Sequence, residues 1–207
     1  MTRRQPDKAR AADPGIASVR RLAREVDPEP EHAFQVCKLA EILFDRTTFI
    51  HGLGADARRL LSAGALLHDI GHTISEQGHH KHARDLILGY ELPGFSETER
   101  AVVAMIARYH RKTHPSKSHK IFCELDSDSQ ALVTKLAALL RIADGLDRAH
   151  DAAVRDLRAE LQDARIAITV GLRRSSPTDI WGGQRKRGLF EDTFGLEVEI
   201  TGEVEER

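Results

Sequence analysis

Along the first two thirds of the chain, apolar residues recur every three or four positions, the period of α-helices that bury one face. The pattern predicts helices over about residues 16–26, 31–46, 56–69 and 82–90, another from residue 97, and a long one over about 129–150. Proline-containing stretches at residues 27–30 and 93–94 separate neighbouring helices. Ser96 and Glu99 have the spacing of a capping box, and Ser18 is a candidate cap for the first helix.

Beyond residue 150 the pattern changes to the alternation that is typical of β-strands. It predicts strands over 157–161 and 166–172, joined at Gln162-Asp163, then a helix over 178–194 and a third strand over 196–200. We therefore predict a mainly α fold with a mobile tail (1–15), a helical domain (16–150) and a small α+β C-terminal subdomain (151–207). A three-stranded sheet exposes edges that other chains commonly cover, which makes a homodimer a candidate assembly.

Composition limits the classes of partner. The 31 Lys and Arg residues balance 32 Asp and Glu residues, for a formal net charge of -1, so no global attraction to nucleic acid or to a membrane surface is expected. The two cysteines, Cys37 and Cys123, lack Cys-x-x-Cys spacing, which favours a reducing, cytoplasmic environment with Cys37 packed on its helix. We recognise neither a secretion signal at the N-terminus nor an apolar run near the ~20 residues that a membrane span requires.

Separate predicted helices place polar side chains on their apolar faces: His32, the adjacent pair His68-Asp69, His110 and Asp144. Each one alone fits a structural role, as a satisfied core histidine or a capping carboxylate. Together they form a mixed nitrogen and oxygen ligand set suited to zinc, manganese, iron or cobalt. A bound cation would also offset the several kcal/mol that it costs to bury a carboxylate.

A second ion can be accommodated if His82, at the start of a short predicted helix, joins this set. Two cations about 3.5–4 Å apart can activate a water molecule and stabilise the oxygens during displacement at phosphorus. The sequence therefore predicts a metal centre suited to phosphate ester chemistry.

The order His32, His68-Asp69, Asp144 resembles that of the HD superfamily of metal-dependent phosphohydrolases, whose fold is an HD-domain helical bundle. The intervening His82 and His110 resemble the two-metal branch of that superfamily. The resemblance implies that His32, His68, Asp69 and Asp144 hold one divalent ion, and that His82 and His110 hold a second ion and share Asp69. Mn, Fe, Zn, Co and Mg are the candidate metals.

Longer motifs resemble the C-terminal half of the exopolyphosphatase and guanosine pentaphosphate phosphohydrolase (Ppx/GppA) family. They lie at residues 18–22, 78–82, 92–95, 107–112, 140–148 and 189–191. The 207 residues leave no room for the actin-like phosphatase region of those enzymes, so we do not expect that site here. No Gly-Tyr-Pro follows His110, which argues against the cyclic-di-GMP branch, and no alarmone synthetase region is recognisable.

The resemblance gives Asp69 the role of bridging ligand. The candidate catalytic residues are Asp69 and Asp147, and the candidate phosphate-binding residues are Lys81, Arg111, Lys112 and Arg148. Solvent-facing charge is the alternative role for the first three cations, because exposed charges are common and individually weak. An intrahelical or surface role is the alternative for Asp147 and Arg148. The histidines at positions 72, 79, 80 and 114 lie nearby in sequence but on no definable stripe.

Our main hypothesis is a metal-dependent phosphohydrolase that cleaves a phosphoester or phosphoanhydride of a nucleotide or of polyphosphate. The alternative is a non-catalytic regulatory module, related to exopolyphosphatase C-terminal domains, that binds phosphate chains or nucleotides. A third hypothesis is a helical scaffold with inert histidines. The expected partners are phosphorylated small molecules; nucleic acid and membranes are not expected.

Overall fold

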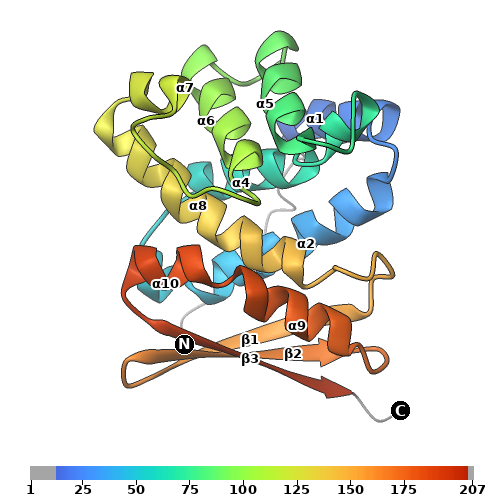
Figure 1. The fold of residues 1–207 in the computed structure, drawn as a ribbon, viewed down its shortest axis with the longest axis vertical. Helices are drawn as coiled ribbons and strands as arrows, with labels where there is room; N and C mark the ends of the chain where they lie inside the picture. Colours follow the sequence, from blue (N-terminus) through green and yellow to red (C-terminus); the bar gives the residue numbers. More distant parts are fainter. Residues whose placement is uncertain (1–12, 205–207) are drawn as a thin grey trace, which may run out of the picture.

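A computed structural model describes residues 13–204 of the chain. In chain order the elements are α1 (Pro14–Val26), α2 (Pro30–Arg46), α3 (Thr48–His51), α4 (Ala55–Leu66), the 3₁₀ helix η1 (Ile70–Thr73), α5 (His79–Gly89), α6 (Glu97–Arg108), α7 (Lys120–Glu124), α8 (Ser127–Gly145), β1 (Val154–Gln162), β2 (Arg165–Leu172), α9 (Pro177–Lys186), α10 (Gly188–Phe194) and β3 (Glu197–Val204). The predicted mainly α fold with a small α+β C-terminal part is confirmed (Figure 1). The predicted mobile tail lies almost entirely outside the described residues.

Local sequence accounts for most helix starts. The carboxylate of Asp13, rather than the predicted Ser18, caps α1 by accepting hydrogen bonds from the backbone N–H groups of Gly15 and Ile16. Pro30 stands at the first position of α2, where its missing N–H costs nothing. The capping box of Ser96 and Glu99 is confirmed at the start of α6.

Several helices end earlier than their apolar period predicts. Helix α4 stops at Leu66, so that His68 and Asp69 follow it instead of lying within it. Helix α6 ends at Arg108, just before His110, and α8 ends at Gly145, just after Asp144. His68, Asp69, His110 and Asp144 therefore lie at the C-terminal ends of helices, where the helix dipole favours positive charge.

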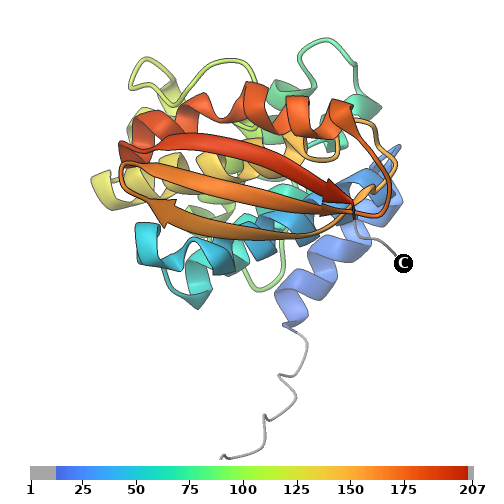
Figure 2. The same ribbon diagram turned by 90° about the horizontal axis from the view of Figure 1, so that it is seen from below.

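The C-terminal part consists of one three-stranded sheet and two helices. Strands β1 and β2 pair antiparallel, as a predicted hairpin with its turn at Asp163, while β3 runs parallel to β2 and forms the other edge. The single helix predicted over 178–194 is two helices, α9 and α10, divided at Arg187. Figure 2 shows the outer face of the sheet, which no helix among residues 13–204 covers.

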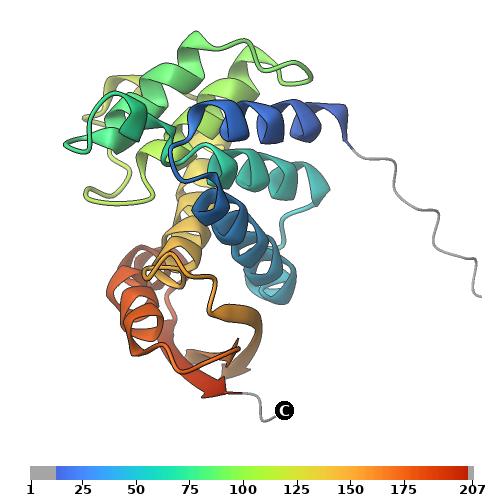
Figure 3. The same cartoon turned by 90° about the vertical axis from the view of Figure 1, so that its right-hand side faces the viewer.

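The inner face of the sheet joins the helical core. Buried side chains of β2, such as Ile168, belong to the same apolar cluster as those of α2, α4, α6 and α8. Cys37 is fully buried in this cluster, as predicted. Figure 3 shows the sheet and α9 at one end of the molecule, with α8 leading from the helical part toward them. No helix within residues 13–204 is long and apolar enough to cross a membrane.

Candidate metal centre

Two of the candidate histidines cap the C-terminal ends of the helices that precede them. Nδ1 of His68 lies 2.7 Å from the carbonyl oxygen of Ala65 in α4, and Nδ1 of His110 lies 2.7 Å from that of Ala107 in α6. A carbonyl oxygen can only accept, so each Nδ1 carries the proton. Each Nε2 therefore carries a lone pair that points away from the helix and is available to a metal.

Two more histidines are held in the same way. Nδ1 of His79, the first residue of α5, lies 3.1 Å from the carbonyl oxygen of Glu76. Nδ1 of His32, in the first turn of α2, lies 2.8 Å from a carboxylate oxygen of Asp147. An outer partner that fixes the tautomer and orientation of a ring is a regular feature of metal-binding histidines.

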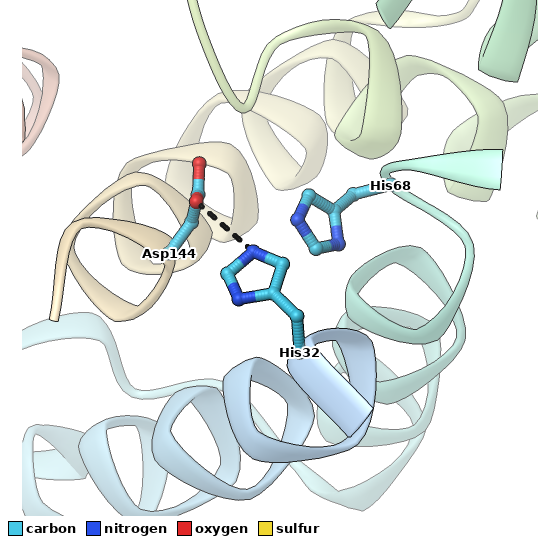
Figure 4. Close-up of side chains that lie close together, drawn as sticks. All are labelled: His32, His68 and Asp144. Atoms are coloured by element: carbon cyan, nitrogen blue, oxygen red, sulfur yellow. Dashed lines mark ion pairs between the residues drawn. The ribbon is translucent and has the colours of Figure 1, made fainter. Parts of the chain in front are cut away.

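The free nitrogens converge on Asp69, and they divide between its two oxygens. Oδ2 lies 3.4 Å from His68 Nε2 and 3.8 Å from His32 Nε2, whereas Oδ1 lies 3.2 Å from His79 Nε2 and 3.4 Å from His110 Nε2. Asp144 closes the first group, with Oδ1 3.7 Å from His32 Nε2. Figure 4 shows His32, His68 and Asp144 converging from three different segments.

Three of these separations, at 3.2–3.4 Å, fit metal coordination, and the two that involve His32 Nε2, at 3.7 and 3.8 Å, are slightly wider. Two ligands that each bind an ion at about 2.0–2.2 Å lie roughly 3–3.5 Å apart in tetrahedral or octahedral geometry. His32 Nε2, His68 Nε2 and Asp69 Oδ1 are buried and have no hydrogen-bond partner. Because an unpartnered buried polar atom is costly, these atoms fit the role of cation ligands. Two groups within the described residues could each hold one: His32, His68 and Asp144, and Asp69, His72 and His79.

The carboxylates of the cluster stay ionised. Burial acts to raise the pKa of Asp69, but the imidazoles of His68 and His110 hold it well below its usual range. Burial also acts to raise the pKa of Asp144, and the ammonium group of Lys186, which contacts this carboxylate, holds it low. Both oxygens of each carboxylate are therefore acceptors at neutral pH.

The histidines divide into two classes. Burial lowers the pKa of His79 to about 4 and that of His110 well below its usual value, so both rings are neutral ligands at pH 7. Burial also acts to lower the pKa of His32, but its contacts with Asp144 and Asp147 prevail and raise it to about 10. A metal at His32 Nε2 would therefore displace a proton.

A close backbone approach places α5 beside Asp69. A Cβ atom at Gly71 would lie 2.0 Å from the carbonyl oxygen of His79 and 2.5 Å from the backbone nitrogen of Ala83. Only glycine lets η1 pack this tightly against the first turn of α5. The glycine after the His68-Asp69 pair thus brings His79 within reach of the carboxylate.

Most of the cluster lines a pocket of about 770 Å³, to which α9 also contributes. Three carboxylates, those of Asp27, Glu29 and Glu76, belong to the lining. The lining also contains six basic side chains: Arg111, Lys112, Arg141, Arg148, Arg185 and Lys186. An anionic ligand with a metal-binding end would therefore be attracted by these cations.

The comparison with known families agrees with the sequence motifs. Residues 16–175 match the family described as Ppx/GppA phosphatase, domain III. The chain belongs to this family. It is also 36% identical, over 84 residues, to the guanosine-5'-triphosphate,3'-diphosphate pyrophosphatase of Pseudoalteromonas translucida (strain TAC 125). The aligned stretch is 41% of this chain but only 16% of that relative, so it corresponds to a small part of a larger protein.

In this Ppx/GppA chain most of the predicted ligands come together, but His82 does not. It lies one turn along α5, does not line the pocket, and has no described contact with Asp69. Instead, Nε2 of His79 lies 3.2 Å from Asp69 Oδ1. The sequence contained a signal for His79. It lies four residues before Ala83, which lies four residues before Ile87, so all three share one buried face of the helix.

His72 was also missed. Its Nε2 lies 3.8 Å from Asp69 Oδ2, and its ring stacks on that of His79 at 3.8 Å between centroids. It is carried by the 3₁₀ helix η1, whose backbone does not follow the α-helical period. No stripe of α-helical spacing could have selected it.

Three of the four predicted phosphate ligands line the pocket, namely Arg111, Lys112 and Arg148, whereas Lys81 is exposed and does not line it. The predicted catalytic residue Asp147 is buried, and its described partners are His32 Nδ1 and the backbone N–H of Ala152.

Arg141 was not predicted, yet it lines the pocket and contacts the loop that carries Lys112. Its guanidinium donates to the carbonyl oxygens of Tyr109 and Lys112, at 3.0 and 3.3 Å. Lys112 has a φ of 61°, a left-handed conformation that is unfavourable for a side chain of this size. Arg141 therefore holds this strained turn in place.

Proposed function

We propose that this chain is a metal-dependent phosphohydrolase that cleaves a phosphoester or phosphoanhydride bond of a nucleotide or of polyphosphate. The observation that carries the proposal is the division of Asp69, whose two oxygens face two different pairs of imidazole nitrogens. A carboxylate placed in this way suits two neighbouring divalent ions. Ions bound there would polarise phosphate oxygens and supply a nucleophile at neutral pH.

We assign one ion to His32, His68, Asp69 and Asp144, and the other to Asp69, His79 and His110, with His72 at its edge. This assignment keeps the expected HD-type arrangement and replaces His82 with His79. The distances between Asp69 and the four imidazole nitrogens support it. Asp147 acts through His32: it orients the ring and increases its basicity, so we regard it as a positioning residue.

The cations of the pocket bind the substrate phosphates. Arg111 lies with Nη1 3.1 Å from His79 Nε2, and Lys186 contacts Asp144, so one cation stands beside a ligand of each proposed ion. A phosphate group seated over Asp69 would lie within reach of both. Their fixed charges would stabilise the negative charge that develops on the phosphate oxygens during displacement.

The test is a panel of phosphoesters, nucleotides and polyphosphate, assayed with metal-loaded protein and with the variants Asp69→Ala and His110→Ala. We expect both variants to lose bound metal and to lose hydrolysis at least a hundredfold, as expected when reacting groups are misplaced. His114→Ala is the matched control, because His114 pairs with Asp192 at the surface and is 42% exposed. Full activity in both site variants would overturn the proposal.

A binding module without turnover is the second candidate. It is favoured by the match to a single domain, and to 16% of a much longer relative, since such a part can serve a larger enzyme as a regulatory piece. The same panel separates the two. Saturable binding of polyphosphate or nucleotide with no released phosphate, by protein with full metal content, would favour the binding module.

A further inference from the structure

Trp181 is the only tryptophan of the chain, and its side chain lies at the edge of the candidate metal pocket. It is 56% exposed, although it is the largest apolar side chain available for burial. It also lines a second, shallower hollow of about 410 Å³ together with Gln184, Arg185 and Arg187. The indole ring thus forms part of the wall between the metal pocket and the adjoining surface.

The backbone of α9, which carries Trp181, is fixed against α8. A Cβ at Gly182, the next residue, would lie 2.2 Å from the carbonyl oxygen of Gly145, so the backbones of α8 and α9 are in direct contact. Asp179, fully buried, accepts hydrogen bonds from the backbone N–H of Ala149 and the hydroxyl of Ser176. The helix that carries Trp181 is therefore fastened to the end of the helix that carries Asp144.

The surroundings of the ring are cationic. The guanidinium of Arg185 lies 5.3 Å from the centre of the Trp181 ring, within the range of a cation–π contact, and Arg185 also lines the metal pocket. Lys186, the next residue of α9, contacts Asp144. One helix therefore presents an exposed aromatic face and, beside it, cations that lead to the metal cluster.

The pocket suits a short phosphate group better than an extended polyanion. Three carboxylates, those of Asp27, Glu29 and Glu76, line it together with the cations, so a long phosphate chain that filled the pocket would meet repulsion. A ligand that joins a short phosphate group to a planar aromatic ring fits α9, because its ring can contact Trp181 while its phosphate contacts the neighbouring cations. The pocket volume of about 770 Å³ lies within the range of small-molecule sites.

We propose that Trp181 stacks on the base of a nucleotide whose phosphates lie between Arg111 and Lys186 over the metal cluster, and that it thereby determines specificity for nucleotides over base-free phosphates. The inference rests on the proposed function, since it uses the same pocket. It adds a residue and a substrate class to that proposal. Every nucleobase has a π-face, so the stacking itself does not select one base.

The test compares two ligands that differ only in the nucleoside. Adenosine and guanosine 5′-(α,β-methylene)diphosphates carry a non-hydrolysable P–C–P group, and methylenediphosphonate is that group alone. Binding to the manganese-loaded full chain is measured by calorimetry, and the fluorescence of the single tryptophan is followed in the same titrations. We expect the nucleotide analogues to quench the fluorescence of Trp181 and to bind at least about tenfold more tightly than methylenediphosphonate. This is the gain in affinity that base–aromatic stacking gives in other proteins.

Variants locate the effect. Trp181→Ala is expected to weaken nucleotide binding about tenfold and to leave methylenediphosphonate binding unchanged, whereas Trp181→Phe retains most of the nucleotide affinity. Phe49→Ala is the matched control, because Phe49 is 58% exposed on α3 and does not line the pocket. Arg111→Ala is expected to weaken both kinds of ligand.

The outcomes separate this inference from the proposed function. Equal nucleotide affinity in the native chain and Trp181→Ala, with hydrolysis intact, overturns the inference alone. A change of oligomeric state in Trp181→Ala, without a change in nucleotide affinity, also overturns it and assigns the ring to a protein contact. If neither ligand binds the metal-loaded chain, the proposed function and the inference both fail.

Discussion

Gly71→Ala is the substitution whose effect can be worked out most directly from the backbone. The added Cβ would lie 2.0 Å from the carbonyl oxygen of His79, whereas ordinary contact begins at 3.4 Å. Because the obstacle is helix backbone in a closely packed interior, η1 and the start of α5 must separate by about 1.4 Å along that line. A shift of this size removes His79 from the range in which it can share an ion with Asp69.

Strain of this kind lowers the free energy of unfolding by about 1–3 kcal/mol. For a chain of this size each kcal/mol lowers Tm by about 2–4 °C. We expect Gly71→Ala to bind one metal ion fewer than the native chain and to hydrolyse phosphoesters about a hundredfold more slowly, because a displacement near 1 Å can cost that much in rate. The assays are thermal unfolding, elemental analysis of bound metal, and turnover.

Gly89→Ala is the matched control at the other end of α5, where an added Cβ meets no atom within 4 Å. It should leave metal content and turnover unchanged and can raise stability by up to about 1 kcal/mol, because alanine is the better helix former. His79→Ala adds no bulk and should lose the same ion as Gly71→Ala. An unchanged Tm and full metal content in Gly71→Ala would falsify the close packing on which this account depends.

Three further predictions concern protons and their partners. The raised pKa of His32, about 10, means that metal binding at its Nε2 displaces a proton, so apparent metal affinity should rise about tenfold per pH unit between pH 7 and 9; a flat calorimetric profile would contradict this. Asp147→Asn should weaken metal binding about 10–100-fold, since it removes the charge behind His32 and keeps its shape; unchanged affinity would contradict the positioning role. Burial, and then the charge of Arg108, lower the pKa of His80 to about 3, so the folded chain stays unprotonated there while the unfolded chain takes up a proton below about pH 6.5. This part of the stability is present above pH 6.5 and is lost toward pH 3, so Tm of metal-free His80→Leu should fall less between pH 7.5 and 5 than that of the native chain; an equal fall would contradict it.

The apolar period predicted the helices well but not where they end. Leu66, Leu67 and His68 continue the helical spacing without a break, so the pattern alone extends α4 through Asp69. The helix stops because the His68 ring turns back to the carbonyl oxygen of Ala65. This is a side-chain hydrogen bond that no count of apolar positions contains, and the same holds for His110 in α6.

The choice between His79 and His82 shows a second limit. The four consecutive residues from His79 to His82 include three histidines. Which of them faces inward depends on whether the helix begins at residue 79 or at residue 82. The parallel pairing of β3 with β2 was beyond the sequence pattern for a related reason. Strand pairing is non-local, and alternation gives the faces of a strand but not its neighbour.

The central claim is that two ions share Asp69, with His79 as a ligand of the second ion. Elemental analysis of the native chain, His79→Ala and His82→Ala, purified and reconstituted with manganese side by side, tests it most directly. The account predicts two ions per chain in the native protein, one in His79→Ala and two in His82→Ala. Equal metal content in all three proteins, or loss of an ion from His82→Ala alone, would contradict it.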